Sequence, residues 1–244
     1  MRLHYTQSGA GPLTVVLTHG LAAGEATWAA QVPALADRYR VLTWDLRGHG
    51  RSAPVPQRCT LGELAAELRC VLDDAGVERA VVLGHSAGGV IAMQFALDNP
   101  ARTAGLVLVG TASECNARAR QFYEDLAAIA EERGMEPVRK RLGVSPVQAR
   151  QMPADAATFA HVARAMASLN AAPLTARLAE ITAPVQMIVG ERDFLGAGGS
   201  VILHRNLPGS RLAIVPERGH GLFLEDPTGF NALVLEFLDS IADA

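Results

Sequence analysis

The sequence shows little that is typical of a secretion signal or of a membrane-spanning segment. Its opening stretch, MRLHYTQSGAGP, has no charged head followed by an apolar run, so no signal peptide is expected. No later stretch approaches the unbroken apolar length of a membrane helix. The only cysteines are Cys59, Cys70 and Cys115, without CxxC spacing. An odd cysteine count without a secretion signal predicts reduced thiols and a cytoplasmic protein.

Charge blocks and metal motifs are missing as well. The formal net charge is only −3, and no long basic or acidic run occurs, which argues against nucleic acid or an anionic membrane as the main partner. There is no HExxH motif and no cysteine pair, so no metal site is expected. The remaining partners are a small-molecule substrate and, at most, a second copy in a homodimer.

The composition is that of an ordinary globular protein. With 244 residues, 49% hydrophobic and 19% charged, the chain can form one large α/β domain with a substantial core. Short runs rich in Val, Ile and Leu predict strands buried on both faces. These runs are 13–18, 40–45, 80–84, 105–110, 184–190 and 211–216.

Helical patterns lie between most of these runs. In 61–76 the leucines recur on one helix face, and 228–242 is amphipathic in the same way. Alternating strands and helices predict a mostly parallel sheet with helices on both sides. A further strand at 3–9 is expected to pair antiparallel at the edge.

The alternation breaks once, between residues 111 and 180. Helical patterns cover 116–134, 155–170 and 173–180, with Asn116, Asp155 and Pro173 at their starts. We interpret 111–180 as a small helical cap inserted between two core strands, the core being 1–110 and 181–244. The cap is expected to cover the carboxyl edge of the sheet and to set acyl-chain preference.

The stretch VVLGHSAGG places Ser86 between glycines where a strand becomes a helix. A sharp turn there strains the central residue and crowds its neighbours, and Gly84 and Gly88 remove the crowding. The hydroxyl of Ser86 is then raised above the sheet, beside the positive end of the following helix. Taken alone, this pattern also fits a turn serine without chemistry.

A serine nucleophile needs a base and an orienting carboxylate. His220 lies in a glycine-flanked loop after the last strand, where α/β sheets carry their sites. Asp193 follows another strand end, although Glu191 and Asp226 are close enough in sequence to be confused with it. The other histidines are interpreted as packing, hydrogen-bonding or surface residues: His4, His19, His49, His85, His161 and His204.

The motifs GHSAGG, THGLAAGEATW, DLRGHGRS, GERD and RGHGLFLEDP occur in this order. Together they resemble the α/β-hydrolase family, in particular its esterase, lactonase and haloperoxidase-like branch. The resemblance runs over nearly the whole core and implies a sheet flanked by helices. Since only two residues precede the 3–9 segment, seven strands are expected rather than eight.

The resemblance also implies roles for residues. Ser86, His220 and Asp193 correspond to the catalytic triad, and the backbone N–H groups of Leu21 and Ala87 to the oxyanion hole. A structural loop without chemistry is implied for Asp45, Arg47, Gly48, His49, Gly50 and Ser52. The implied activity is cofactor-free hydrolysis of a small or medium carboxylic ester or lactone through an acyl-enzyme.

Several alternatives stay open. A carbon–carbon bond hydrolase or a cofactor-free perhydrolase or haloperoxidase uses the same triad, and a ligand-binding receptor on this fold can retain it. A serine at position 86 argues against branches that use aspartate there. The candidate lining of an acyl pocket, each member of which could equally be packing, is Trp28, Phe122, Tyr123, Phe159, Met166 and Phe223.

Overall fold

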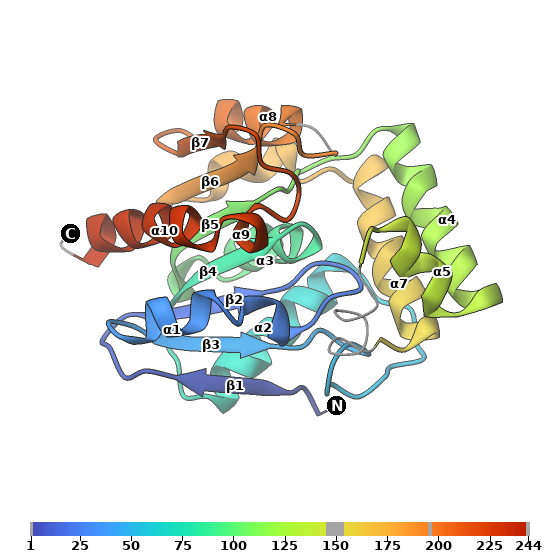
Figure 1. Ribbon diagram of the computed structural model, residues 1–244, viewed down its shortest axis with the longest axis horizontal. Coiled ribbons are helices and arrows are strands. Elements are labelled where there is room, and N and C mark those ends of the chain that lie inside the picture. Colours follow the sequence, from blue (N-terminus) through green and yellow to red (C-terminus); the bar gives the residue numbers. More distant parts are fainter. Residues whose placement is uncertain (1, 145–153, 195–196, 243–244) are drawn as a thin grey trace.

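The computed structural model describes residues 2–144, 154–194 and 197–242. Its centre is a seven-stranded sheet in the order β1-β3-β2-β4-β5-β6-β7 (Figure 1). All neighbours are parallel except β1 and β3, which pair antiparallel at one edge. The predicted mostly parallel sheet of seven strands is confirmed. The strands are β1 (Tyr5–Ser8), β2 (Thr14–Thr18), β3 (Arg40–Trp44), β4 (Ala80–His85), β5 (Thr103–Val109), β6 (Val185–Gly190) and β7 (Arg211–Val215).

The central strands are buried on both faces because both faces carry helices. Side chains alternate along a strand: Val15 and Leu17 of β2 pack into one core cluster, whereas Val16 packs into the other. Helices α1 and α10 cover the first face, and α2 and α3 cover the second (Figure 1). The helices bordering the sheet are α1 (Gln31–Ala36), α2 (Leu61–Asp74), α3 (Ala87–Asp98), α8 (Gly198–Asn206), α9 (Leu222–Glu225) and α10 (Pro227–Ala242).

The segment between β5 and β6 folds into helices. Helix α4 spans Ala117–Arg133, α5 spans Met135–Arg141 and α7 spans Ala156–Ala167. The side chains of Asn116 and Asp155 accept hydrogen bonds from backbone N–H groups in the first turns of α4 and α7, as expected of helix caps.

Two details of this segment differ from expectation. The 173–180 pattern forms only a 3-10 helix over Thr175–Glu180. Helix α5 was not predicted. Gly134, with φ 76°, ends α4, and the seven residues after it are too few to show a clear helical pattern in the sequence. The sequence signal of α5 is the run of basic residues in its last turn.

The parallel strands point their carboxyl ends toward α4, α5 and α7 (Figure 1). Ser86, Asp193 and His220 follow three of these strand ends, so the fold brings them to one edge of the sheet beside the helical segment. Within the described residues, no helix combines the length and the apolar character needed to span a membrane.

Candidate active site

Ser86 occupies a strained turn between β4 and α3. Its backbone has φ 53° and ψ −118°, a region that residues other than glycine rarely adopt. Two bonds from neighbouring segments hold it there. The N–H of Ser86 donates to the carbonyl of Val109 at 2.8 Å, and the hydroxyl of Thr111 donates to the carbonyl of Ser86 at 2.8 Å. The strain is therefore maintained by β5 and the residues after it.

The glycines on either side are required by close backbone approaches. A Cβ at Gly84 would lie 2.3 Å from the carbonyl oxygen of Gly88. One at Gly88 would lie 2.2 Å from the carbonyl oxygen of Thr18 on the neighbouring strand β2. The sharp turn can therefore form only with both side chains absent, and it places Ser86 at the N-terminus of α3.

Asp193 and His220 meet directly. The Nδ1 of His220 donates to the carboxylate of Asp193, with distances of 2.9 Å to Oδ2 and 3.1 Å to Oδ1. The Asp193 side chain is 1% exposed and that of His220 is 18% exposed. Because Nδ1 is the donor, Nε2 of the neutral ring is the acceptor.

A glycine makes room for this pair. Gly110 ends β5 with φ 51°, and a Cβ there would lie 2.9 Å from Oδ2 of Asp193 and 3.1 Å from Nδ1 of His220. Sequence reasoning missed Gly110, although a glycine directly after a buried strand at the site edge was a readable signal.

The two rival carboxylates are bound elsewhere. Glu191 accepts a hydrogen bond from the backbone N–H of Glu217 at 3.0 Å. Asp226 accepts one from the N–H of Gly229 at 3.0 Å and lies 3.6 Å from the guanidinium of Arg218. Of these three carboxylates, Asp193, the one expected to orient the histidine, is hydrogen-bonded to His220 in the described structure, and the described bonds of Glu191 and Asp226 go to other groups.

Three further histidines hold the chain near the site: His19 and His49 are fully buried, and His85 is half-buried. His85 donates from Nε2 to the carbonyl of His220 at 3.0 Å, and the two rings lie 4.6 Å apart. His19 bonds the carbonyl of Gly20 at 2.7 Å and accepts from the N–H of Leu46. His49 bonds the carbonyl of Arg47. These contacts fit the expected packing and hydrogen-bonding roles and fix the loops around Ser86.

Burial makes these rings sensitive to acid. Desolvation lowers the pKa of His19 to about 4 and that of His49 to about 3, and it holds the pKa of His85 well below its usual range. In the unfolded chain each ring binds a proton near pH 6.5, so protonation favours unfolding. The contribution of these neutral rings to the free energy of unfolding is therefore fully present above pH 6.5, and it decreases as the pH drops from 6.5 toward 4.

We expect urea unfolding at pH 5 to show a free energy of unfolding lower than at pH 7.5. The loss should be about 2 kcal/mol for each buried histidine that stays neutral in the folded state. Equal stability at the two pH values would show that these rings become protonated without unfolding the protein.

A cavity of about 420 Å³ opens above Ser86. Leu21 lines it together with Ser86 and His220, while Ala87 is the buried first residue of α3. The backbone turns sharply after Leu21, since Ala22 has φ 54°. Of the two residues expected to form the oxyanion hole, Leu21 thus lines the same cavity as Ser86, and Ala87 directly follows the serine in the chain.

The candidate pocket residues divide into two groups. Phe122, Tyr123 and Phe223 line the cavity. The other three are fully buried in the core, outside the described lining, and for them a packing role replaces the pocket assignment: Trp28, Phe159 and Met166. The reason is that the apolar face of a helix such as α7 turns toward α4 and the core, not toward the cavity.

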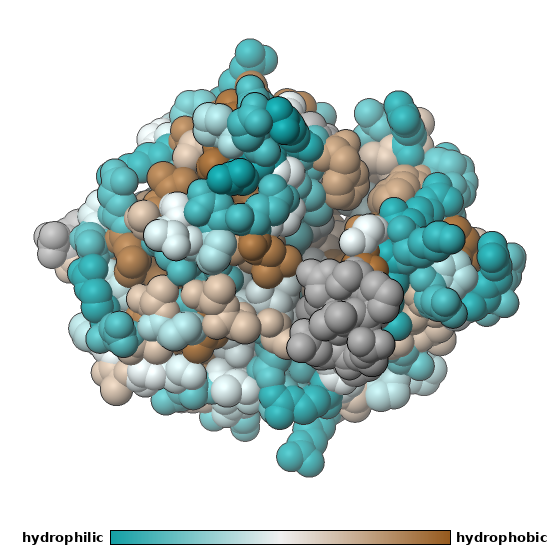
Figure 2. Space-filling model, in the orientation of Figure 1, coloured by the Kyte–Doolittle hydropathy of each residue, from teal (hydrophilic) through white to brown (hydrophobic). Residues whose placement is uncertain are grey.

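Sequence reasoning also missed part of the cavity rim. Phe194 and Leu224 line the cavity, although they are 61% and 43% exposed. The ring of Phe194 stands edge-on to His220 at 4.7 Å. The sequence feature that could have identified them is their position, because each lies within a few residues of Asp193 or His220. In Figure 2, hydrophobic residues reach the surface between the core and the mainly hydrophilic outer side of α4 and α5.

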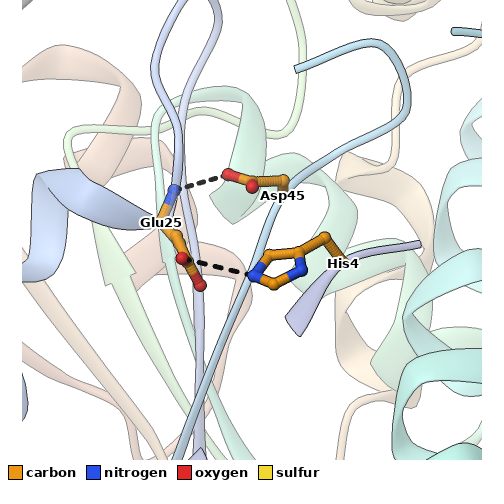
Figure 3. A group of neighbouring side chains, drawn as sticks. All are labelled: His4, Glu25 and Asp45. Atoms are coloured by element: carbon orange, nitrogen blue, oxygen red, sulfur yellow. Dashed lines mark hydrogen bonds and ion pairs between the residues drawn. The ribbon is translucent and has the colours of Figure 1, made fainter. Parts of the chain in front are cut away.

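A separate group of polar side chains lies away from the cavity. Ligating atoms of His4, Glu25 and Asp45 all lie within 4.8 Å of one another (Figure 3). Their existing bonds account for this arrangement. Asp45 accepts from the backbone N–H groups of Glu25 at 2.7 Å and Arg51 at 2.9 Å, and His4 lies 3.4 Å from the Glu25 carboxylate.

Glu25 is bound on its other side as well. Burial pushes the pKa of Glu25 upward, but hydrogen bonds from Thr6 and Arg51 outweigh it and hold the pKa below its usual value. The group therefore ties together the N-terminus and the loops after β2 and β3, which matches the structural role expected for Asp45 and its neighbours.

Comparison with known proteins agrees with this architecture. The sequence profile of the alpha/beta hydrolase fold matches residues 14–129. The protein "Putative carbamate hydrolase RutD" of Caulobacter vibrioides is 33% identical over 97% of this chain and 95% of its own length. The chain belongs to the α/β-hydrolase family.

Two other family members differ in the reactions that their names describe. A 2-hydroxy-6-oxononadienedioate/2-hydroxy-6-oxononatrienedioate hydrolase of Pseudomonas putida is 32% identical, covering 98% of this chain and 92% of its own. A thermophilic esterase of Thermogutta terrifontis superposes with a TM-score of 0.88 at 25% identity, covering 98% of this chain and 93% of the esterase. The family is thus clear, whereas the names of these relatives describe different substrates.

Proposed function

We propose that this protein is a serine hydrolase that cleaves small or medium carboxylic esters or lactones. The observation that carries the proposal is the bond between Asp193 and His220, together with Ser86 and His220 lining one cavity. A hydroxyl at a strained turn, an oriented imidazole and a buried carboxylate are the components of acyl transfer. The names of the relatives support hydrolysis in general, and the site supports the ester.

In the proposed reaction, Nε2 of His220 takes the proton of the Ser86 hydroxyl as its oxygen attacks the substrate carbonyl. The bond from Nδ1 to Asp193 keeps Nε2 in the accepting form and stabilises the imidazolium. His220 then passes the proton to the leaving alcohol. Water, deprotonated by the same ring, attacks the acyl-enzyme, and Ser86 leaves with the proton.

The negatively charged oxygen of the tetrahedral intermediate must be stabilised by hydrogen-bond donors. We propose the backbone N–H groups of Leu21 and Ala87, of which the second lies at the positive end of α3. A donor of this kind typically contributes ~3 kcal/mol to the lowering of the barrier. Helices α4, α5 and α7 are proposed to act as the cap, since Phe122 and Tyr123 of α4 line the cavity.

The cavity favours a neutral, apolar substrate over a dianionic one. Most of its described lining is apolar, and its rim carries Phe194 and Leu224. Apart from His85 and His220, the ionisable side chains in the described lining are Tyr123 and Glu225. The described lining contains the Glu225 carboxylate and no lysine or arginine, so it offers a dicarboxylate little charge compensation. This observation ranks the ester reaction above cleavage of a carbon–carbon bond in a dioate.

The test is turnover of aryl esters of graded acyl length, with lactones, an aryl carbamate and a vinylogous diketone in the same assay. We expect the highest kcat/KM for an ester or lactone. A higher value for the carbamate or the diketone would assign the triad to that reaction, and binding without turnover of any compound would favour a receptor.

A further inference from the structure

A second cavity, of about 220 Å³, meets the first one at the nucleophile. Among the described lining residues, Ser86 and Tyr123 are the two that the cavities share. Tyr123 comes from α4, so one side chain of the cap stands at the junction opposite the reacting serine. The remaining lining of the second cavity is Val90, Gly110, Thr111, Ala112, Glu114, Cys115, Asn116, Ala119, Leu169, Gly199 and Ile202.

The other polar side chains of this second cavity are already engaged. The Thr111 hydroxyl donates to the carbonyl of Ser86 at 2.8 Å. Glu114 accepts from the Thr175 hydroxyl at 2.5 Å, and Asn116 caps α4. The thiol of Cys115 contacts the backbone carbonyls of Met166 and Ala167 at the end of α7.

Tyr123 differs from them. Its hydroxyl has no hydrogen-bond partner in the described part of the chain, and the side chain is half-buried, lining both cavities. Burial raises the pKa of Tyr123 to about 12, with smaller contributions from Cys115 and the Asp193 carboxylate. The hydroxyl therefore stays protonated near neutral pH, as a donor within electrostatic range of the triad.

A tyrosine hydroxyl at the wall of a cavity, without a partner in the described protein, can donate a hydrogen bond to an acceptor bound there. We propose that Tyr123 is a specificity-determining residue that donates a hydrogen bond to the substrate. The preferred substrates are then esters or lactones with an ether or ketone oxygen close to the scissile carbonyl. This inference rests on the proposed ester hydrolysis at Ser86, and it adds which esters are preferred.

Matched esters test this preference on both sides of the scissile bond. On the acyl side, 4-nitrophenyl methoxyacetate is compared with 4-nitrophenyl butyrate, in which a CH₂ group replaces the ether oxygen. On the alcohol side, 2-methoxyethyl butyrate is compared with butyl butyrate. The ratio of kcat/KM within each pair is measured for the native protein and for Tyr123→Phe, so that intrinsic ester reactivity cancels.

We expect Tyr123→Phe to lower this ratio about two- to tenfold in at least one pair, as the loss of one hydrogen bond implies. Tyr5→Phe is the matched control. It removes the same atom from β1 at the far edge of the sheet and should leave both ratios unchanged. Unchanged ratios in Tyr123→Phe for both pairs would overturn the proposal.

Binding provides a readout that does not depend on turnover. The dissociation constants of the same esters are measured by NMR titration for Ser86→Ala and for Ser86→Ala with Tyr123→Phe. A two- to tenfold weaker binding of the ether ester alone supports the role of Tyr123, even where the native protein hydrolyses no ester and the proposed function fails. Equal weakening of ether and alkyl esters contradicts it, because the effect is then one of shape.

Discussion

Replacing Ser86 by alanine is expected to lower ester turnover by about four orders of magnitude or more, since no other group then forms the acyl-enzyme. The fold should survive. The bonds that hold Ser86 in the turn run through its backbone, to Val109 and from Thr111, and its side chain makes no capping bond to α3. Alanine keeps these bonds, so the circular dichroism spectrum and the melting temperature should stay nearly unchanged.

Covalent labelling identifies the same atom independently. An aryl phosphonate should add one adduct to the native protein, mapped by mass spectrometry to Ser86, and none to Ser86→Ala. Ser240→Ala is the matched control, because Ser240 lies on α10 and bonds only the carbonyl of Phe237 among the described contacts. Labelling at another serine, or full turnover by Ser86→Ala, would remove Ser86 from the mechanism.

The second large effect is expected at Asp193. Its replacement by asparagine should lower kcat about 10⁴-fold, because an amide facing Nδ1 of His220 favours the wrong tautomer of the ring. Asparagine has nearly the same size as the buried aspartate. The fold should therefore persist, and circular dichroism with kinetics on one aryl ester separates loss of chemistry from loss of structure.

Two neighbouring carboxylates serve as matched controls. Glu191→Gln and Asp226→Asn each replace an acid near the triad by its amide, but these acids bond the backbone N–H groups of Glu217 and Gly229. Both variants should keep most of the activity. If one of them is the damaging change and Asp193→Asn stays active, the orienting acid is misassigned, while Ser86 and His220 keep their roles.

The sequence by itself determined the sheet and the turn at the nucleophile. Runs such as TVVLT are apolar at consecutive positions, which only a strand covered on both faces can satisfy, and β2 forms there. Gly84 and Gly88 indicated a close approach of backbone segments, because glycine is the residue that lacks a Cβ. These are local constraints, so they can be read without knowing what lies opposite.

The tertiary structure alone decided which residues surround the substrate. Apolar spacing shows that a side chain is turned away from water. It does not show whether that side chain packs against a neighbour in the core or lines a cavity. Phe159 and Met166 therefore looked like pocket residues and proved to be core, whereas exposed Phe194 lines the cavity. The direct bond of Asp193 to His220 and the position of the Tyr123 hydroxyl between two cavities depend on groups distant in sequence, whose positions follow only from the packed fold.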